Sequence, residues 1–235
     1  MEKITIRDLI KHINDKYQGD ALIKICTEAS HAEGLAKGEV CLGTFEYFRK
    51  NFQGEGRSGE KDGVFSKEFV VGEEFDSPLG KTTINLPDLQ GEKGRVEYIL
   101  TGLIFCLFHF TNKTNIDAEL IKSKGSLGKY FVVFESHKTL GEGFRFLQFD
   151  HTLTNNIVLE PKIEDGESIF CREVDYVDVP DGGGFQKQKE YSYQNEYRFC
   201  FKIDGFDAPK IYGSLSAQFI FKTHPLECEL FEIID

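Results

Sequence analysis

Several features are scarce or absent in this sequence of 235 residues. It has no tryptophan, one methionine and six prolines, and its longest apolar run, residues 98–108, is too short and too interrupted to cross a bilayer. No targeting or lipidation signal is visible. We therefore expect a cytoplasmic protein with no membrane partner.

Positive charge is also in short supply. Lysine and arginine together number 28, against 39 aspartates and glutamates, which gives a formal net charge of -11. Binding to a phosphate backbone needs a clustered basic surface, so we expect no nucleic-acid partner. The acidic excess either serves solubility alone or presents an acidic surface to a partner protein with a basic surface.

Signatures of metal, phosphate and nucleophile sites are missing as well. The six histidines show no i, i+4 pair and no cysteine spacing typical of zinc, and there is no P-loop or G-x-S-x-G motif. We expect no metal site and no covalently bound cofactor. The cysteines fall singly without a C-x-x-C motif, which indicates reduced, buried thiols: Cys26, Cys41, Cys106, Cys171, Cys200 and Cys228.

Cys106 and His109 bring a thiol and an imidazole close together in the sequence. Residues three apart on a strand face opposite sides, so the two side chains do not form a nucleophile and base pair. We interpret Cys106 as a core residue and His109 as a histidine with satisfied hydrogen bonds.

Phenylalanine is abundant, with 22 copies, and a core built on it favours sheet over helix. Apolar residues at helical spacing predict a helix over residues 5–17 with Thr5 as its cap, and a second helix over 28–37 capped by Thr27. Alternating segments follow, among them 21–26, 40–43, 64–75, 82–86, 130–134, 144–149, 156–160 and 168–179. The pattern predicts an α+β fold, with short N-terminal helices followed by a mainly antiparallel, Phe-rich sheet in a single domain, 1–235.

Two polar stretches interrupt these elements. Residues 51–63 mix glycines with charged residues, a composition that cannot bury a face and that predicts a mobile loop. Residues 88–94 form a polar loop ahead of 95–110, which we interpret as a central buried strand or a strand pair bent at Gly102.

The segment 191–203 combines aromatic residues with charge. Read as one strand, it places Tyr193, Asn195, Tyr197, Phe199 and Phe201 on one face. The other face then carries Gln194, Glu196, Arg198, Cys200 and Lys202. Such a polar face is either a solvated sheet surface or the floor of a cleft.

Three segments resemble ADP-ribosyltransferase-like folds. These are the strand Ile23-Lys24-Ile25-Cys26 with the helix that follows, the segment 38–44 with Tyr47 and Arg49 after it, and the late strand with Glu196. The same parts are similar to uncharacterised phage and prophage proteins that carry a late Gln-x-Glu-Tyr-Arg strand. The first strand lacks the histidine or arginine of such enzymes, and no Ser-Thr-Ser follows.

The resemblance implies a nucleotide site. Glu196 would be the catalytic residue that stabilises a developing oxocarbenium ion, and NAD would be the ligand. Cofactor-binding roles would fall to Lys24 or Cys26, to Thr44 or Tyr47, and to Arg49. For Arg49 the alternative is a solvated or loop-anchoring arginine.

Glu196 has its own physical rationale. A carboxylate flanked by Tyr193 and Tyr197 in a partly dry cleft would stabilise positive charge. The alternative is a cross-strand pair with Arg or Lys on a sheet surface, worth roughly 0.2–1 kcal/mol.

Three functions follow as hypotheses. The first is an NAD-binding, ADP-ribosyltransferase-like protein of a phage or mobile element, with or without catalysis. The second is an acidic, non-catalytic inhibitor that binds a host protein through a basic surface. The third is a module whose strand edges mediate homo-oligomerisation.

Overall fold

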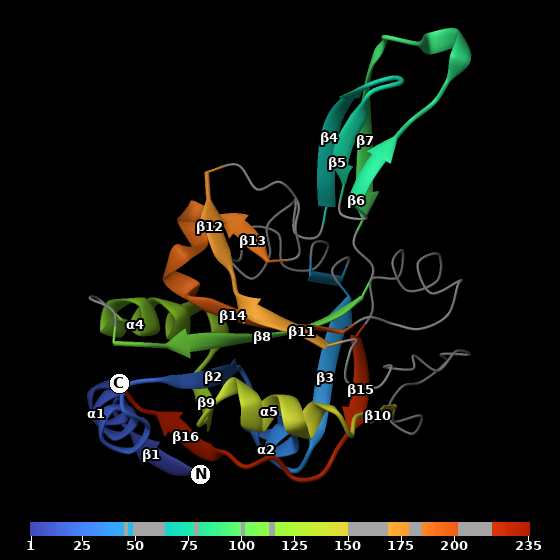
Figure 1. The fold of residues 1–235 in the computed structure, drawn as a ribbon. Helices are drawn as coiled ribbons and strands as arrows, with labels where there is room; N and C mark the ends of the chain where they lie inside the picture. The colour runs from blue at the N-terminus through green and yellow to red at the C-terminus, as the bar shows by residue number, and fades with distance from the viewer. Residues whose placement is uncertain are drawn as a thin grey trace.

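A computed structural model describes residues 1–44, 47–48, 64–77, 80–99, 102–112, 116–149, 169–178, 185–201 and 218–235. Across these ranges the protein has the predicted α+β fold, in which helices flank a large mixed sheet (Figure 1). The predicted mobile loop 51–63 and the predicted strand 156–160 lie outside the described residues.

The main sheet has ten strands. They are β1 (Glu2–Ile4), β2 (Ala21–Cys26), β3 (Glu39–Thr44), β8 (Leu103–Phe110), β9 (Tyr130–Phe134), β10 (Gln148–Phe149), β11 (Ile169–Glu173), β14 (Glu196–Phe201), β15 (Gln218–Lys222) and β16 (Glu229–Ile233). The order along the sheet is β1-β16-β9-β2-β8-β3-β15-β10, and β14 and β11 continue from the other edge of β8. Only the β1–β16 pair among these strands is parallel, so the prediction of a mainly antiparallel sheet is confirmed.

Helices cover both faces of the sheet. They are α1 (Ile6–Tyr17), α2 (Ala29–Ala36), α4 (Ile116–Leu127) and α5 (His137–Phe144). One core cluster joins α1 and α4 to the face that carries Ile23 and Phe108. The other cluster joins α2 and α5 to the face that carries Phe105, Phe199 and Phe221. Both clusters are rich in phenylalanine, as the composition predicts.

The first helix shows why the N-terminal prediction succeeded. The Thr5 hydroxyl accepts a hydrogen bond from the Asp8 backbone N–H at 3.1 Å, which satisfies one of the otherwise unpaired amides of the first turn. The helix ends where the backbone turns left-handed at Gln18 and Gly19. A Cβ on Gly19 would lie 2.0 Å from the Asn112 side chain, so only glycine fits there.

Several predicted boundaries were wrong. Glu28, not Thr27, is the N-cap residue of α2. By contrast, the interpretation of 95–110 as a strand pair bent at Gly102 (φ 152°) is confirmed, and the two strands are β7 (Lys93–Ile99) and β8. The predicted strand 144–149 is the end of α5 followed by the two-residue β10.

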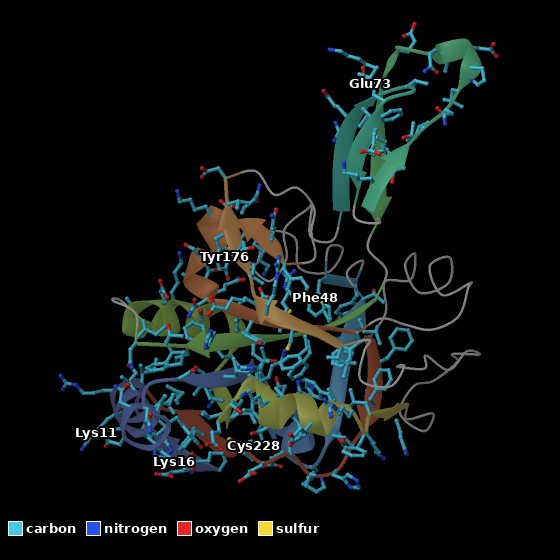
Figure 2. The ribbon with its side chains drawn as sticks, in the orientation of Figure 1. Lys11, Lys16, Phe48, Glu73, Tyr176 and Cys228 are labelled. Atoms are coloured by element: carbon cyan, nitrogen blue, oxygen red, sulfur yellow. The ribbon has the colours of Figure 1, made fainter. Side chains whose placement is uncertain are left out.

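An arm projects from the main sheet (Figure 1). It contains the antiparallel pair β4 (Val64–Val70) with β7, and the antiparallel pair β5 (Glu74–Ser77) with β6 (Gly80–Thr83). The 3-10 helix η1 (Pro87–Leu89) lies at its outer end, near Glu73 in the β4–β5 turn (Figure 2). The predicted polar loop 88–94 is this exposed end, although β7 already begins at Lys93.

A small unit lies over the polar face of β14. It consists of β12 (Asp175–Val177), which pairs in parallel with β13 (Gln186–Gln188), and of the 3-10 helix η2 (Lys189–Gln194). It brings Lys187 and Gln194 next to the first residue of β14, Glu196.

Candidate functional site

The main sheet divides along one edge of β8. On this edge β2 pairs with β8 only from Phe108 to Phe110, and β3 pairs with it only at Leu103 and Ile104. Neither strand therefore lies beside Phe105, Cys106 and Leu107. In this gap the Lys24 ammonium donates a hydrogen bond to the Cys106 carbonyl at 2.9 Å, which replaces a bond that a neighbouring strand would supply.

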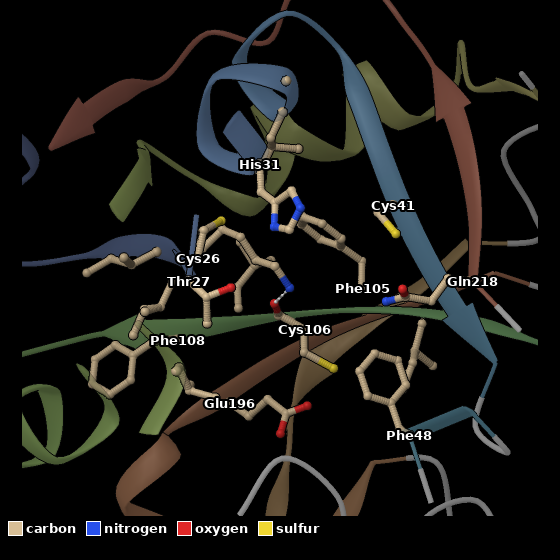
Figure 3. Close-up of a pocket in the computed structure, with 18 of the residues that line it drawn as sticks. Cys26, Thr27, His31, Cys41, Phe48, Phe105, Cys106, Phe108, Glu196 and Gln218 are labelled. Atoms are coloured by element: carbon tan, nitrogen blue, oxygen red, sulfur yellow. Dashed lines mark hydrogen bonds between the residues drawn. The ribbon is translucent and has the colours of Figure 1, made fainter. Parts of the chain in front are cut away.

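A cavity of about 580 Å³ occupies the gap. Figure 3 views it across β8, with His31 and Cys41 toward α2 and β3 and Glu196 toward β14. The volume falls in the range of roughly 300–1,000 Å³ that is typical of small-molecule sites. Its wall combines aromatic rings with polar groups and includes Ile23, Lys24, Cys26, Cys41, Tyr47, Phe48, Phe105, Cys106, Phe108, Leu127, Gln194 and Glu196.

Four residues singled out in the sequence line this one cavity: Lys24, Cys26, Tyr47 and Glu196. Thr44 does not line it. Its side chain is buried and accepts a hydrogen bond from the Tyr47 backbone N–H at 3.0 Å, so it fixes the segment that carries Tyr47. Arg49 lies outside the described residues.

The segment 191–203 is not one strand. β14 begins only at Glu196, because residues up to Gln194 form η2 and Asn195 adopts a left-handed conformation (φ 38°). Within β14 the predicted faces are confirmed: Tyr197, Phe199 and Phe201 enter the core. Lys202 lies outside the described residues.

The surroundings of Glu196 differ from those predicted. Tyr197 lies on the opposite face of the strand, and the Tyr193 ring contacts the Lys122 ammonium. The carboxylate instead lies 2.6 Å from the Lys187 ammonium and 2.5 Å from Arg198 Nε. The alternative of a pair with Lys or Arg is therefore the observed one, but it is buried rather than on a surface.

Burial and charge act in opposite directions on Glu196. Desolvation alone would raise the pKa of this carboxyl, but the positive charges of Arg198 and Lys187 outweigh it and hold the pKa well below its usual range. Glu196 is thus ionised at neutral pH. Its backbone N–H donates to the Tyr176 hydroxyl at 2.8 Å, and burial followed by the charge of Glu196 raises the pKa of that phenol.

Sequence reasoning did not single out Lys187, and it placed Gln194 on the polar face with Glu196 without assigning it a role. Both are buried, and the Lys187 ammonium donates to Gln194 Oε1 at 2.8 Å. Lys187 stands in a run of polar residues, Gln186 to Glu190, in which no local pattern marks one lysine as buried. Only the pairing of β12 with β13 places it over β14.

The interpretation of the cysteines needs correction. Cys106 belongs to the cavity wall rather than to either core cluster, and Cys41 and Cys171 are exposed. All six thiols are free. Desolvation, and then the charge of Glu196, raises the pKa of the Cys106 thiol, so Cys106 is a weak nucleophile at neutral pH.

His109 agrees only in part with its interpretation as a histidine with satisfied hydrogen bonds. Its Nε2 lies 2.9 Å from Asp20 Oδ1. Its Nδ1 lies 2.8 Å from Glu173 Oε1, but the geometry is not that of a hydrogen bond, and this buried atom has no hydrogen-bond partner among the described residues. Across the ranges that the structure describes, no group of three His, Cys, Asp or Glu side chains is placed to hold a metal ion. No helix in those same ranges is long and apolar enough to cross a membrane.

Comparisons of the chain with protein-family models, with curated proteins and with solved structures found no match.

Proposed function

We propose that the cavity in the divided sheet binds a nucleotide, and that NAD is the first ligand to test, in an arrangement like that of ADP-ribosyltransferases. The observation that carries the proposal is the convergence of Lys24, Tyr47 and Glu196 on one cavity. The resemblance assigns these three residues, which lie in separate segments of the chain, to a nucleotide site. That they line the same cavity is a property of the fold and does not depend on the resemblance.

The surroundings of the Lys24 ammonium favour a ligand with an anionic group. Its ammonium contacts the Cys106 carbonyl and lies 4.6 Å from the centre of the Phe105 ring. Among the described residues, no carboxylate lies within ion-pair distance of it. A half-buried ammonium with these neighbours favours a phosphate or carboxylate.

The aromatic side chains in the cavity wall favour a ligand with a planar ring. Tyr47 and Phe48 line the cavity beside the end of β3, and Phe105 and Phe108 line it from β8. Aromatic side chains contribute large apolar contact areas and accept stacked rings. Lys24 and these rings together suit a molecule with an anionic group and a planar heterocycle, as in a nucleotide.

Catalysis is the less strongly supported part of the proposal. In cleavage of the bond between ribose and nicotinamide, the bonding electrons leave with nicotinamide, and water or an acceptor nucleophile attacks the ribosyl carbon. Glu196 would supply a fixed negative charge beside that carbon. Since Lys187 and Arg198 hold both carboxylate oxygens, less of this charge acts on the cavity. We therefore propose ligand binding as the main function of the cavity, and cleavage of the bond between ribose and nicotinamide as a separate, second activity.

Isothermal titration with NAD, and with ADP-ribose and nicotinamide separately, tests the binding proposal. Lys24→Met should weaken binding of NAD and ADP-ribose about tenfold, since a charged hydrogen bond contributes roughly 1.5–3 kcal/mol. Lys11→Met is the matched control, because Lys11 is exposed on α1 away from the cavity (Figure 2). No binding of NAD or of ADP-ribose by the unmodified protein would refute the proposal.

Nicotinamide release from NAD tests the catalytic part. Glu196→Gln should abolish release while folding is monitored by circular dichroism. Equal release by the unmodified protein and this variant, or none by either, would remove the enzyme hypothesis.

The projecting arm favours a second candidate, the acidic inhibitor that binds a partner protein. Leu86 and Leu89 at its outer end are 44% and 49% exposed, and Glu73, Asp88 and Glu92 around them are exposed too. A small apolar centre with an acidic rim suits a partner with a basic surface, such as the host protein that a phage inhibitor would bind.

Leu89→Asp tests this candidate. The variant should lose a complex that the unmodified protein forms in host lysate, and the complex should weaken steeply with salt. The matched control is Ile121→Asp, an exposed apolar residue on α4. A complex that resists both salt and Leu89→Asp would contradict an interface on the arm.

A further inference from the structure

A chain of buried polar side chains leads from β14 to the cavity. Arg198 Nε contacts Glu196 Oε1, Glu196 Oε2 contacts the Lys187 ammonium, and that ammonium donates to Gln194 Oε1 at 2.8 Å. The members come from β14, β13 and η2. The last of them, Gln194, lines the cavity and is only 5% exposed.

The chain fixes the orientation of the Gln194 amide. An ammonium only donates hydrogen bonds, so the amide atom that faces Lys187 must be the oxygen. The amide nitrogen Nε2 is then directed away from Lys187, and among the residues that the structure describes it has no hydrogen-bond partner. A buried N–H donor without a partner is rare in folded proteins, and a bound water, ion or ligand can supply the acceptor.

We propose that Gln194 recognises the bound ligand by donating a hydrogen bond from Nε2 to a carbonyl oxygen of that ligand. Glu196 acts as a positioning residue in this proposal, because it holds Lys187 and, through it, the amide. This inference rests on the proposed function only because both concern the same cavity. It adds the chemical class: a planar ring that carries a carbonyl group, as nicotinamide does.

The apolar cavity wall near Gln194 favours a ligand with a planar ring. Phe108 pairs with Glu196 across the β8–β14 ladder, and both line the cavity. Leu127 and Ile23 add apolar surface to the same cavity. A single hydrogen-bond donor in apolar surroundings orients a flat ligand and selects for the acceptor on it.

Nuclear magnetic resonance of the 15N-labelled protein tests the contact directly. The Gln194 side-chain amide resonance is assigned by its loss in Gln194→Glu. We expect it to shift on addition of nicotinamide and to stay in place on addition of 3-methylpyridine, which has a similar ring but no carbonyl. A resonance that moves with neither probe, or equally with both, would overturn the proposal.

Affinity measurements give a second readout. Gln194→Glu keeps the shape and the contact with Lys187 but replaces the donor by an acceptor, so nicotinamide and NAD should bind about tenfold more weakly. Gln188→Glu adds the same charge on the exposed side of β13 and should change affinity less than twofold. Equal losses in both variants would contradict the proposal, since they would indicate a general charge effect.

The outcomes separate this inference from the proposed function. If NAD binds and Gln194→Glu binds it equally well, the nucleotide proposal stands and the role of Gln194 is refuted. If NAD does not bind but nicotinamide shifts the Gln194 resonance, the nucleotide proposal is refuted and the role of Gln194 stands. Lys187→Met should reduce the preference for nicotinamide over 3-methylpyridine if the lysine holds the amide, and an unchanged preference would remove the positioning role.

Discussion

The Lys187 ammonium lies 2.6 Å from Glu196 Oε2, and these two side chains are only 2% and 6% exposed. A buried pair of this kind does not by itself indicate high stability, because desolvating the two charges cancels most of their attraction. Removing one partner is costly, since it leaves the other charge buried. The pair therefore makes a clear prediction for unfolding experiments.

Glu196→Gln should lower the free energy of unfolding by about 3 kcal/mol, because it removes the carboxylate that both Lys187 and Arg198 contact. Lys187→Met should lower it by less, because Glu196 keeps its contact with Arg198. The double variant should lose less than the sum of the two single losses. Urea unfolding of all four proteins measures the coupling between the two sites. Strict additivity would show that the two groups do not interact in solution.

Glu229 should make the free energy of unfolding depend on pH. Its carboxylate accepts hydrogen bonds from Tyr17 and His12 and pairs with Lys16 at 3.0 Å. Desolvation would raise its pKa, but these hydrogen bonds lower it to about 2. A carboxyl whose pKa is lower in the folded than in the unfolded protein adds stability above the unfolded value of 4.5, and this stability is lost as the pH falls from about 5 toward 2.

Glu229→Gln should therefore flatten the decrease in unfolding free energy between pH 5 and pH 2, as measured by urea unfolding at several pH values. Glu135→Gln, at an exposed position, is the control and should leave the slope unchanged. Identical slopes for the unmodified protein and Glu229→Gln would show that Glu229 is not held by these partners.

Two helical glycines should respond differently to alanine. A Cβ on Gly125 of α4 meets nothing within 4 Å, so Gly125→Ala should stabilise the protein by about 0.5–1 kcal/mol through helix propensity. A Cβ on Gly143 of α5 would lie 2.6 Å from Leu226, so Gly143→Ala should gain less or destabilise the protein. Thermal unfolding compares the two, and an equal gain would mean that Leu226 moves aside freely.

Thiol labelling reports on the cavity. Cys41 and Cys171 are both exposed, but only Cys41 lines the cavity. Bound NAD should slow labelling of Cys41 by an aromatic disulfide reagent and leave Cys171 unaffected, as peptide mass spectrometry can show. Cys106 should label slowly at neutral pH because its thiol pKa is raised. Equal protection of Cys41 and Cys171 would place the bound molecule outside the cavity.

Strong local periodicity made part of the fold predictable. The stripe Ile6, Leu9 and Ile13 and the cap at Thr5 gave α1, and short apolar runs gave β2 and β9 with their observed bounds. The candidate residues Lys24, Tyr47 and Glu196 line one cavity. Whether that cavity binds a nucleotide stays a prediction.

The parts of the structure that the sequence did not predict depend on tertiary contacts. Helix α5 was missed because Gly141 and Gly143 lower helix propensity, yet Gly143 lets the helix approach Leu226 closely. The aromatic alternation before Glu196 predicted strand, but the left-handed Asn195 ends η2 there. Lys187 looks like any exposed lysine until β13 is placed over β14.

The strand order also bears on how the cavity comes into being during synthesis. β2 and β3, which flank the gap, belong to the first part of the chain, but β16 pairs with β9 on the β2 side and β15 pairs with β3. Each flank is therefore completed by a strand that follows β14 in the chain. Contacts so distant in sequence form slowly. A nascent chain that ends before β15 exposes two unfinished strand edges and lacks the part of the cavity wall that Gln218 and Ile220 supply, so its early segments need protection from aggregation until β15 and β16 have been synthesised.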